Sequence, residues 1–367
     1  MWLSICGIRA AMIARSPRST IRHTMNHSPT PIQRNKAIAT WLLICCGMVF
    51  AMVVLGGVTR LTGSGLSIAE WRPIMGALPP LSDAEWQRVF DIYRETPEFQ
   101  KVNSHFDVHD FKGIFWLEYL HRVLGRLLGF VFALPLVYFV ARKYISLREL
   151  PWYLLMLALG GAQAVIGKIM VASGQVDAPN VSHYRLTAHL AAAVLVYALM
   201  FWRSLGLLSP TEPGPRHPWY RKTTAITTLI VITILSGGFV AGLDAGLVYP
   251  TFPMMGQYWF PPELFSLDPF WHNFFDNRTT VQFDHRLLAI TTFMLIVVYW
   301  LRARRADLPS CSRRGANALL HTSVLQVVLG ISTLLLGVPV WLAASHQGVA
   351  MLLFTVALYL QHSLRRG

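Results

Sequence analysis

Four histidines lie inside long apolar stretches of this sequence, where an ionisable side chain is costly and by default indicates function. They are His121, His189, His285 and His346, each within about two helical turns of the predicted outer end of its stretch. Two histidines at one depth on facing helices of a bundle can bind one heme iron from opposite sides. We therefore predict two heme-sized sites near the outer surface, with His121 and His189 as axial ligands of one iron and His285 and His346 of the other. The alternative for each histidine is a hydrogen-bonded packing role.

Charged side chains beside these histidines indicate further roles. Arg122 and Arg286 directly follow two of them. A guanidinium at the membrane boundary suits bidentate binding of a heme propionate carboxylate, and snorkelling to the interface is the alternative. Glu118 stands three residues before His121, and the matching position of the second half holds Gln282. Because positions i and i+3 share a helix face, we expect Glu118 to border the first heme pocket.

An acid in only one half predicts a division of labour between the two sites. A carboxylate beside the iron can remove a proton or stabilise developing positive charge, which a pure electron carrier does not need. We therefore expect the first histidine pair to hold a reacting heme, with Glu118 as a catalytic residue, and the second pair to hold a permanent cofactor heme. A structural Glu118, paired to Arg122 one turn on, is the alternative.

Long apolar helices must position these histidines, and the chain supplies eight. Of the 367 residues, 54% are hydrophobic and 14% charged, which is too apolar for a soluble protein of this length. An apolar run of about 20 residues crosses the hydrocarbon core as a helix. Such runs cover roughly residues 38–58, 115–140, 152–172, 184–207, 223–243, 281–301, 316–337 and 341–362. The predicted fold is therefore an all-α integral membrane protein.

The distribution of charge predicts the orientation of these spans. The formal net charge is +14, and 20 of the 32 lysines and arginines lie in the N-terminal tail, in three loops and at the C-terminal end, which hold only three acids. By the positive-inside rule, these segments and both termini face the cytoplasm or the mitochondrial matrix. The opposite loops hold most of the acids, so the basic balance records membrane topology and excludes a nucleic-acid role.

The second half of the sequence repeats the first in the same order. The matched segments are Gly56-Gly57 with Gly237-Gly238, His121-Arg122 with His285-Arg286, Gln163 and Gly167 with Gln326 and Gly330, and His189 with His346. Four spans repeat as four spans, and an even number restores the starting side of the membrane. We therefore predict two pseudo-symmetric four-helix bundles in a parallel repeat, related by an axis along the membrane normal.

The repeat and the charge pattern predict the organisation of the chain. Residues 1–36 form a basic tail, 37–208 the N-terminal half, 209–222 a cytoplasmic linker and 223–367 the C-terminal half. The tail has five arginines and no acid, a composition typical of a mitochondrial presequence, and an over-extended bacterial start gives the same composition. We predict a multi-pass protein of the bacterial inner membrane, with the mitochondrial inner membrane as the alternative.

The four cysteines offer no disulfide on the outer face. Cys45 and Cys46 lie within the first span, Cys6 lies in the tail and Cys311 lies in a cytoplasmic loop. The sequence also lacks a C-x-x-C-H motif, which excludes covalent c-type heme attachment.

Two long motifs resemble those of a known family. The stretch from Gly56 to Ile68, followed by Glu70-Trp71 and Gly76 to Pro80, is similar to the first outer loop of heme A synthases of the proteobacterial and mitochondrial type. The segment from Glu118 to Arg126 is similar to the second-span motif of that family. The resemblance covers about residues 37 to 363. Some bacterial members carry a cysteine pair in an outer loop, and this sequence has none, so a thiol relay is not expected.

The resemblance implies an activity, a substrate and a cofactor. The family oxidises the C8 methyl group of heme O, through the hydroxymethyl and a hydrated aldehyde, to the formyl group of heme A for cytochrome oxidase assembly. It implies Glu118, His121 and His189 as the residues that act on heme O. It implies His285 and His346 as ligands of heme b. Besides the lipid bilayer, heme O synthase and cytochrome oxidase assembly factors are the implied partners.

Two other classes use similar features. A di-heme b-type membrane electron-transfer protein, such as a quinol or ferric reductase, would use four equal-depth histidines equally well, and the contrast of Glu118 with Gln282 separates it from an enzyme. Transporters also contain internal repeats and polar intramembrane residues. The parallel repeat and the position of the polar residues near one surface argue against a midplane transport site.

Overall fold

The computed structural model of this chain describes residues 30–69, 78–174, 181–209 and 215–365. Across these residues the secondary structure is helical and includes no strand, only one isolated bridge between Met255 and Tyr258. Eight helices are long and apolar enough to cross a membrane. They are α1 (Pro31–Leu61), α4 (Val108–Ala141), α5 (Leu150–Ala172), α6 (His183–Leu208), α7 (Tyr220–Gly242), α9 (Arg278–Ala303), α10 (Ser310–Leu335) and α11 (Val340–Ser363). The eight predicted spans are therefore confirmed as helices.

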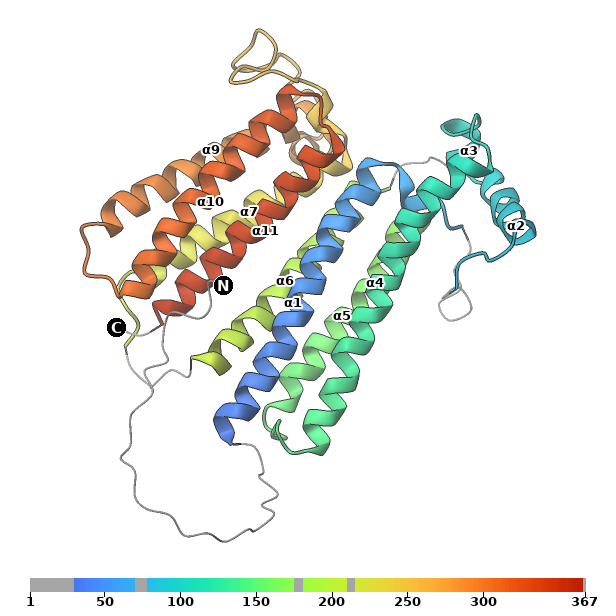
Figure 1. The fold of residues 1–367 in the computed structure, drawn as a ribbon. Coiled ribbons are helices and arrows are strands. Elements are labelled where there is room, and N and C mark those ends of the chain that lie inside the picture. Colours follow the sequence, from blue (N-terminus) through green and yellow to red (C-terminus); the bar gives the residue numbers. More distant parts are fainter. Residues whose placement is uncertain (1–29, 70–77, 175–180, 210–214, 366–367) are drawn as a thin grey trace, which may run out of the picture.

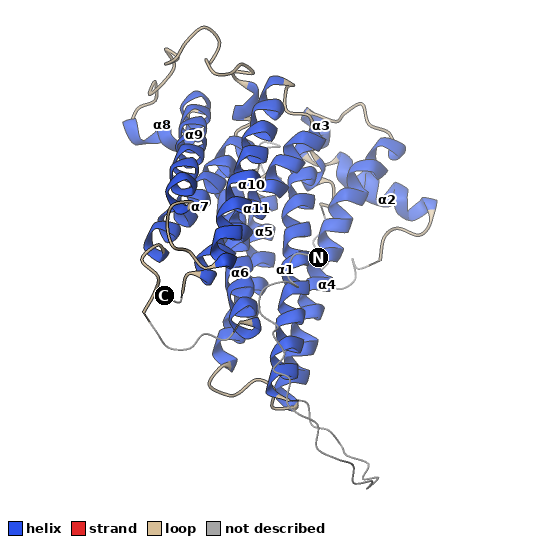
Figure 2. Ribbon diagram, turned by 60° about the vertical axis from the view of Figure 1, so that its left-hand side comes forward, coloured by secondary structure: helices blue, strands red, loops and turns tan. Residues whose placement is uncertain are grey.

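The eight long helices form two groups of four, with α1, α4, α5 and α6 in one and α7, α9, α10 and α11 in the other (Figure 1). Contacts of α1 with α11 and of α6 with α7 join the groups. Figure 2 shows the helices side by side, with loops at both ends. The end that carries the short helices α2 (Asp83–Arg94), α3 (Pro97–Lys101) and α8 (Asn273–Asp276) is called the outer end below, and the opposite end the inner end. Helix α1 starts and α11 finishes at the inner end (Figure 1).

Burial separates central from peripheral helices. In the most apolar part of α1 and of α6, 44% of the residues are buried, against 6% in α5. Helix α4 exposes a stripe of large apolar side chains, Leu127, Phe130, Leu134 and Val137, at helical spacing. A stripe of this kind is unfavourable in water, so this face of α4 is suited to lipid.

A buried core packs the long helices together between the histidines and the inner end. It includes Leu42 and Cys45 of α1, Met200 of α6, Ile296 of α9 and Phe354 of α11. The Tyr197 and Thr355 hydroxyls, 2.7 Å apart, add a hydrogen bond between α6 and α11. Since well-packed interiors resist deformation, this core gives the outer ends of the helices a rigid base.

The outer segment between the first two spans contains two helices that the sequence analysis treated as loop. Helices α2 and α3 bury aromatic side chains, among them Trp86 and Tyr93, against Phe111 and Phe115 of α4. Phe111 precedes the predicted second span, residues 115–140, and Phe115 is its first residue. Glu70, Trp71 and Gly76, which contribute to the family resemblance, lie outside the described residues.

Three spans, α1, α4 and α10, begin several residues earlier than predicted, and the starts of the first two are capped by side chains. Asp107 and Asp110 form a capping box, which satisfies the first N–H groups of a helix, so α4 begins at Val108. Thr30 and Gln33 do the same for α1, so the last six residues of the predicted tail 1–36 are helical. Residues 1–29 of that tail lie outside the described part of the chain.

A short turn follows the first helix of each group. The 3₁₀ turn η1 (Ser64–Leu66) follows α1, and η3 (Ala245–Leu247) follows α7. Each is preceded by a residue in the left-handed region, Gly63 at φ 65° and Asp244 at φ 50°. The turn η1 itself contacts α4, and η3 contacts α9.

Candidate functional site

The four histidines fall into two pairs, one in each group of helices. His121 on α4 lies near His189 on α6, and His285 on α9 lies near His346 on α11. These are the partners that the sequence analysis predicts. Iron binding by them stays a prediction.

Each of these histidine rings lies against a glycine of a neighbouring helix. A methyl carbon placed on Gly56 of α1 would lie 3.2 Å from His121 Nε2, and one on Gly167 of α5 would lie 3.4 Å from His189 Cε1. In the other group, a methyl carbon added to Gly237 of α7 would lie 3.2 Å from His285 Cε1, and one added to Gly330 of α10 would lie 2.8 Å from His346 Cε1. Carbon atoms pack best at about 3.5–4.0 Å, so an added methyl carbon would force a shift at Gly330, would be tight at Gly56 and Gly237, and would make an ordinary contact at Gly167. All four glycines belong to the segments that repeat in the sequence.

Several buried polar atoms around these rings have no hydrogen-bond partner within the described residues. They include Nδ1 of His189, Nδ1 of His346 and both amide atoms of Gln163. His285 differs, because its Nδ1 lies 2.8 Å from the Ser236 hydroxyl, which leaves Nε2 for a metal ion. A buried polar atom without a partner is costly unless something else satisfies it. These imidazole nitrogens therefore fit heme iron, for which histidine is a common axial ligand.

Glu118 is held in a network of its own. The residue is buried, and Oε2 accepts hydrogen bonds from the Ser67 hydroxyl at 2.7 Å and the Ile68 N–H at 2.8 Å. Oε1 forms an ion pair with Arg122, with Nη2 at 2.5 Å. Arg122 also donates to the Ile68 carbonyl at 3.0 Å. The pairing that the sequence analysis gave as the structural alternative is thus present, and the catalytic role of Glu118 stays a prediction.

Gln282 and Arg286, the matching residues of the second half, also bind the segment that follows the first helix of their group. Here the side chains donate and the backbone accepts. Gln282 donates through Nε2 to the carbonyls of Gly246 and Tyr249, at 3.3 and 3.2 Å. Arg286 donates to the Tyr249 carbonyl at 2.6 Å and to the Thr251 carbonyl at 2.8 Å. The first half presents N–H and O–H donors at this place and the second half presents carbonyls. The change from acid to amide therefore has a structural cause as well as the predicted chemical one.

Comparisons with known proteins agree with this arrangement. The model of the family described as cytochrome oxidase assembly protein matches residues 39–358. A heme A synthase of Nitrosospira multiformis is 51% identical over 336 residues, which cover 90% of this chain and 94% of the relative. A heme A synthase of Nitrosomonas eutropha is 48% identical over 94% of this chain and 96% of the relative. Human heme A synthase COX15 is 44% identical over 90% of this chain and 83% of the relative.

This chain belongs to the cytochrome oxidase assembly protein family. Within this family member, the second glycine of each repeated pair makes a contact between the two helix groups. Gly57 of α1 faces the side chain of Gln347, which follows His346 on α11 and donates to the Val53 carbonyl at 3.0 Å. Gly238 of α7 faces Thr187 of α6, with 3.0 Å between an added methyl carbon and Oγ1. Each pair therefore places one glycine against its own histidine and the next against the helix that carries a histidine of the other group.

Two polar contacts join the groups at the outer end of this family member. Arg60, at the end of α1, forms a 2.9 Å ion pair with Asp244, which follows α7. Asp276 of α8 accepts a hydrogen bond from the Tyr184 hydroxyl at 2.9 Å and lies 3.0 Å from His183 Nε2 and 2.6 Å from His272 Nδ1. Burial by itself would raise the pKa of Asp276, but the hydrogen bonds from these three side chains together outweigh it and keep the pKa below its usual value.

The sequence analysis missed the residues of these contacts. It left His183 and His272 unassigned, and it gave Gln347 no role although an amide inside a span is itself a signal. The Gln347 amide donates to the Val53 carbonyl of α1, which is far away in the sequence. No local sequence pattern reveals such a partner.

Proposed function

We propose that this chain is a heme A synthase, an oxidoreductase that converts the C8 methyl group of its substrate heme O to the formyl group of heme A. Membership of the family over residues 39–358 supports this activity. The geometric support is the pair of histidine sites, in which every ring lies against a glycine of a neighbouring helix. Two such sites provide one place for a heme that is oxidised as the substrate and one place for a heme that remains bound as a cofactor.

The two halves of the chain are proposed to hold different hemes. The N-terminal half, residues 37–208, binds heme O through His121 and His189. The C-terminal half, residues 223–367, binds heme b through His285 and His346. When bound, heme b supplies a one-electron redox centre for the four electrons that leave as a methyl group becomes a formyl group. The unpartnered ring nitrogens of His189 and His346 support these assignments.

Arginines are proposed to hold the heme propionates. Arg286 has a buried Nε without an acceptor in the described residues, so a carboxylate there would satisfy a donor that is otherwise costly. Arg122 is the corresponding residue of the first half, where Glu118 already provides a carboxylate for its guanidinium. Propionate binding at Arg122 is therefore proposed to share the guanidinium with Glu118.

Glu118 is proposed to take the proton that leaves the substrate methyl group. Its Oε1 is paired with Arg122 and its Oε2 faces two donors, and a carboxylate held near a substrate can serve as a general base. Protonation at Oε2 requires one of its two donors to turn away. Ser67 can do so because its hydroxyl also lies 3.4 Å from the Ile114 carbonyl.

The membrane setting follows from the charge pattern. We propose that both ends of the chain face the cytoplasm of a bacterium, or the matrix if the protein is mitochondrial. Both histidine pairs then lie in the outer halves of their helices. Heme O synthase and cytochrome oxidase assembly factors are proposed as partners that deliver the substrate and receive the product.

The test is heme analysis of the purified protein and of Glu118→Gln, which keeps the shape of the side chain and removes its charge. We expect heme b together with heme O or heme A in the wild type. In the variant we expect heme b and heme O without heme A. Gln282→Ala is the matched control in the other half, and we expect it to retain formation of heme A. Two equivalents of heme b in both the wild type and Glu118→Gln would instead identify a di-heme electron carrier.

A further inference from the structure

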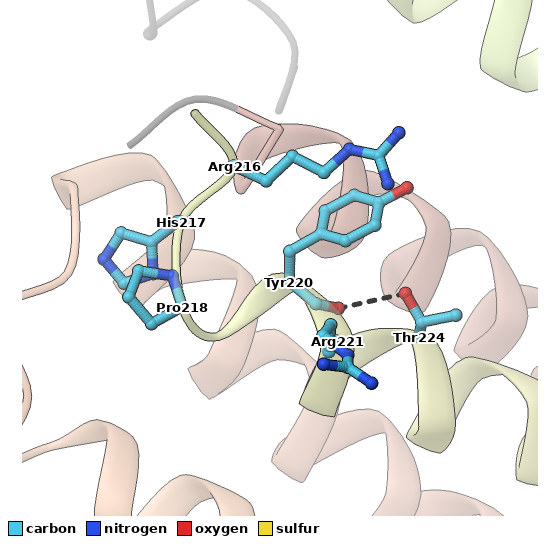
Figure 3. Close-up of a pocket in the computed structure, with 6 residues that line it drawn as sticks. All are labelled: Arg216, His217, Pro218, Tyr220, Arg221 and Thr224. Carbon is cyan, nitrogen blue, oxygen red and sulfur yellow. Dashed lines mark hydrogen bonds between the residues drawn. The ribbon is translucent and has the colours of Figure 1, made fainter. Parts of the chain in front are cut away.

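Two pockets at the inner end of the helices are lined by arginines. One of about 480 Å³ lies where the linker enters α7, and the other of about 420 Å³ lies at the start of α10. The first is lined by Arg216, His217, Pro218, Tyr220, Arg221 and Thr224 (Figure 3). The second is lined by Leu308, Ser310, Arg313, Arg314 and Asn317. Neither lining includes a carboxylate, so both pockets are suited to an anion.

The first pocket has the donors that a phosphate group needs. The Arg216 guanidinium lies over the Tyr220 ring, 4.8 Å from its centroid, and Figure 3 shows it next to the Tyr220 hydroxyl. Arg221 enters the pocket from the first turn of α7. Guanidinium N–H groups match phosphate oxygens in pairs. The Thr224 hydroxyl is already bonded to the Tyr220 carbonyl and to Gln361, at 3.0 and 2.9 Å, so it shapes the wall.

The position of this pocket corresponds to the headgroup layer of a bilayer. Trp219 lies directly beside it, with the Lys222 ammonium 4.4 Å from its ring centroid, and aromatic side chains of this kind mark the membrane boundary. The His217 N–H donates to the Leu364 carbonyl at 3.2 Å, which fixes the linker against the end of α11. The pocket is therefore held at one depth by two helices.

An exposed stripe leads from this pocket toward the hydrocarbon. Arg221, Ala225, Thr228 and Ile232 are all exposed on α7, and their spacing places them on one helix face. The charged residue is at the boundary and the large apolar residue is three turns deeper. This order matches a lipid, whose phosphate lies at the boundary and whose acyl chains run inward.

We propose that the pocket at Arg216 binds the phosphate headgroup of an anionic phospholipid of the inner leaflet, with Arg221 and the Tyr220 hydroxyl as further ligands. Basic pockets between membrane helices on this side bind anionic headgroups in general. A free phosphate would use the same donors, but it would make no use of the stripe on α7. The proposal is independent of the heme chemistry.

The test is binding of phosphatidylglycerol to the purified full-length protein in phosphatidylcholine nanodiscs, read by native mass spectrometry. We expect the wild type to retain phosphatidylglycerol in preference to phosphatidylcholine. The double substitution Arg216→Gln and Arg221→Gln is expected to bind it about 30-fold more weakly, the effect of two surface arginines. Arg304→Gln with Arg305→Gln is the matched control, because it removes the same charge from the same end of the molecule away from both pocket linings.

Three results would overturn the proposal. The first is a wild type without preference for phosphatidylglycerol, which needs no variant and is unaffected by folding. The second is an equal loss of binding in the control, which would reduce the effect to overall charge. The third is displacement of the lipid by inorganic phosphate at millimolar concentration, which would make a free anion the ligand. An unchanged thermal unfolding midpoint in the pocket variant shows that it is folded.

Discussion

Gly330→Ala is the substitution with the clearest expected effect on the second heme site. An added methyl carbon would lie 2.8 Å from His346 Cε1, at least about 0.7 Å closer than an optimal carbon–carbon contact. The imidazole must therefore shift, or α10 and α11 must separate. Overpacking of this kind typically costs about 1–3 kcal/mol. If that cost falls on the bound state, heme b binds roughly 5- to 150-fold more weakly.

The assay is heme b per polypeptide by pyridine hemochrome, after purification of wild type and variant at one protein concentration. We expect the variant to lose heme b and to retain the heme of the first half. Gly161→Ala on α5 is the control, because its added methyl carbon meets nothing within 4 Å. Full heme b content and an unchanged absorption spectrum in Gly330→Ala would refute the assignment of His346 as an iron ligand held by this contact.

Three further changes test the contacts around the sites. Gly57→Ala brings a methyl carbon onto the Gln347 side chain, so we expect a lower midpoint of thermal unfolding. Gly47→Ala on the same helix meets nothing within 4 Å, so it should not lower the midpoint. Burial raises the pKa of Glu98 to about 7, above its unfolded value. The stability of helices α2 and α3 is therefore greatest in acid and is lost as pH rises through 7. Hydrogen exchange of these two helices should show this pH dependence in the wild type and lose it in Glu98→Gln. Asp276→Asn removes the carboxylate charge that His183, Tyr184 and His272 bind. We expect faster hydrogen exchange at the start of α6. Unchanged exchange would mean that this contact does not join the two groups of helices.

The long helices could be predicted from the sequence because a membrane span has a simple requirement. Some 20 apolar residues with satisfied backbone groups are sufficient, and all eight spans were found. Helix starts at Pro31, Val108 and Ser310 were missed. At the first two, polar capping residues extend the helix beyond the apolar run. The helices α2 and α3 were missed because their aromatic side chains pack on α4, a tertiary contact.

The site was predictable where the repeat pointed to it. The pairing of His121 with His189 followed from their shared depth together with their place in the same half of the repeat. The environment of Glu118 was less predictable, because the i and i+3 spacing indicated a place near His121, whereas Ser67 and Ile68 from a separate turn supply its hydrogen bonds. The contact of Gly57 with Gln347 depends on how two halves of the chain pack, which no local pattern contains.

Half-specific loss of heme is the most direct test of the central claim. The measurement is chromatography of the hemes extracted from two purified variants, one with His121→Ala and His189→Ala and the other with His285→Ala and His346→Ala. We predict that the first variant keeps heme b and loses heme O and heme A, and that the second loses heme b. Because heme A formation requires both sites, both variants are expected to lack heme A. Loss of heme b from the first variant, or loss of heme O from the second, would contradict a division between a substrate site and a cofactor site.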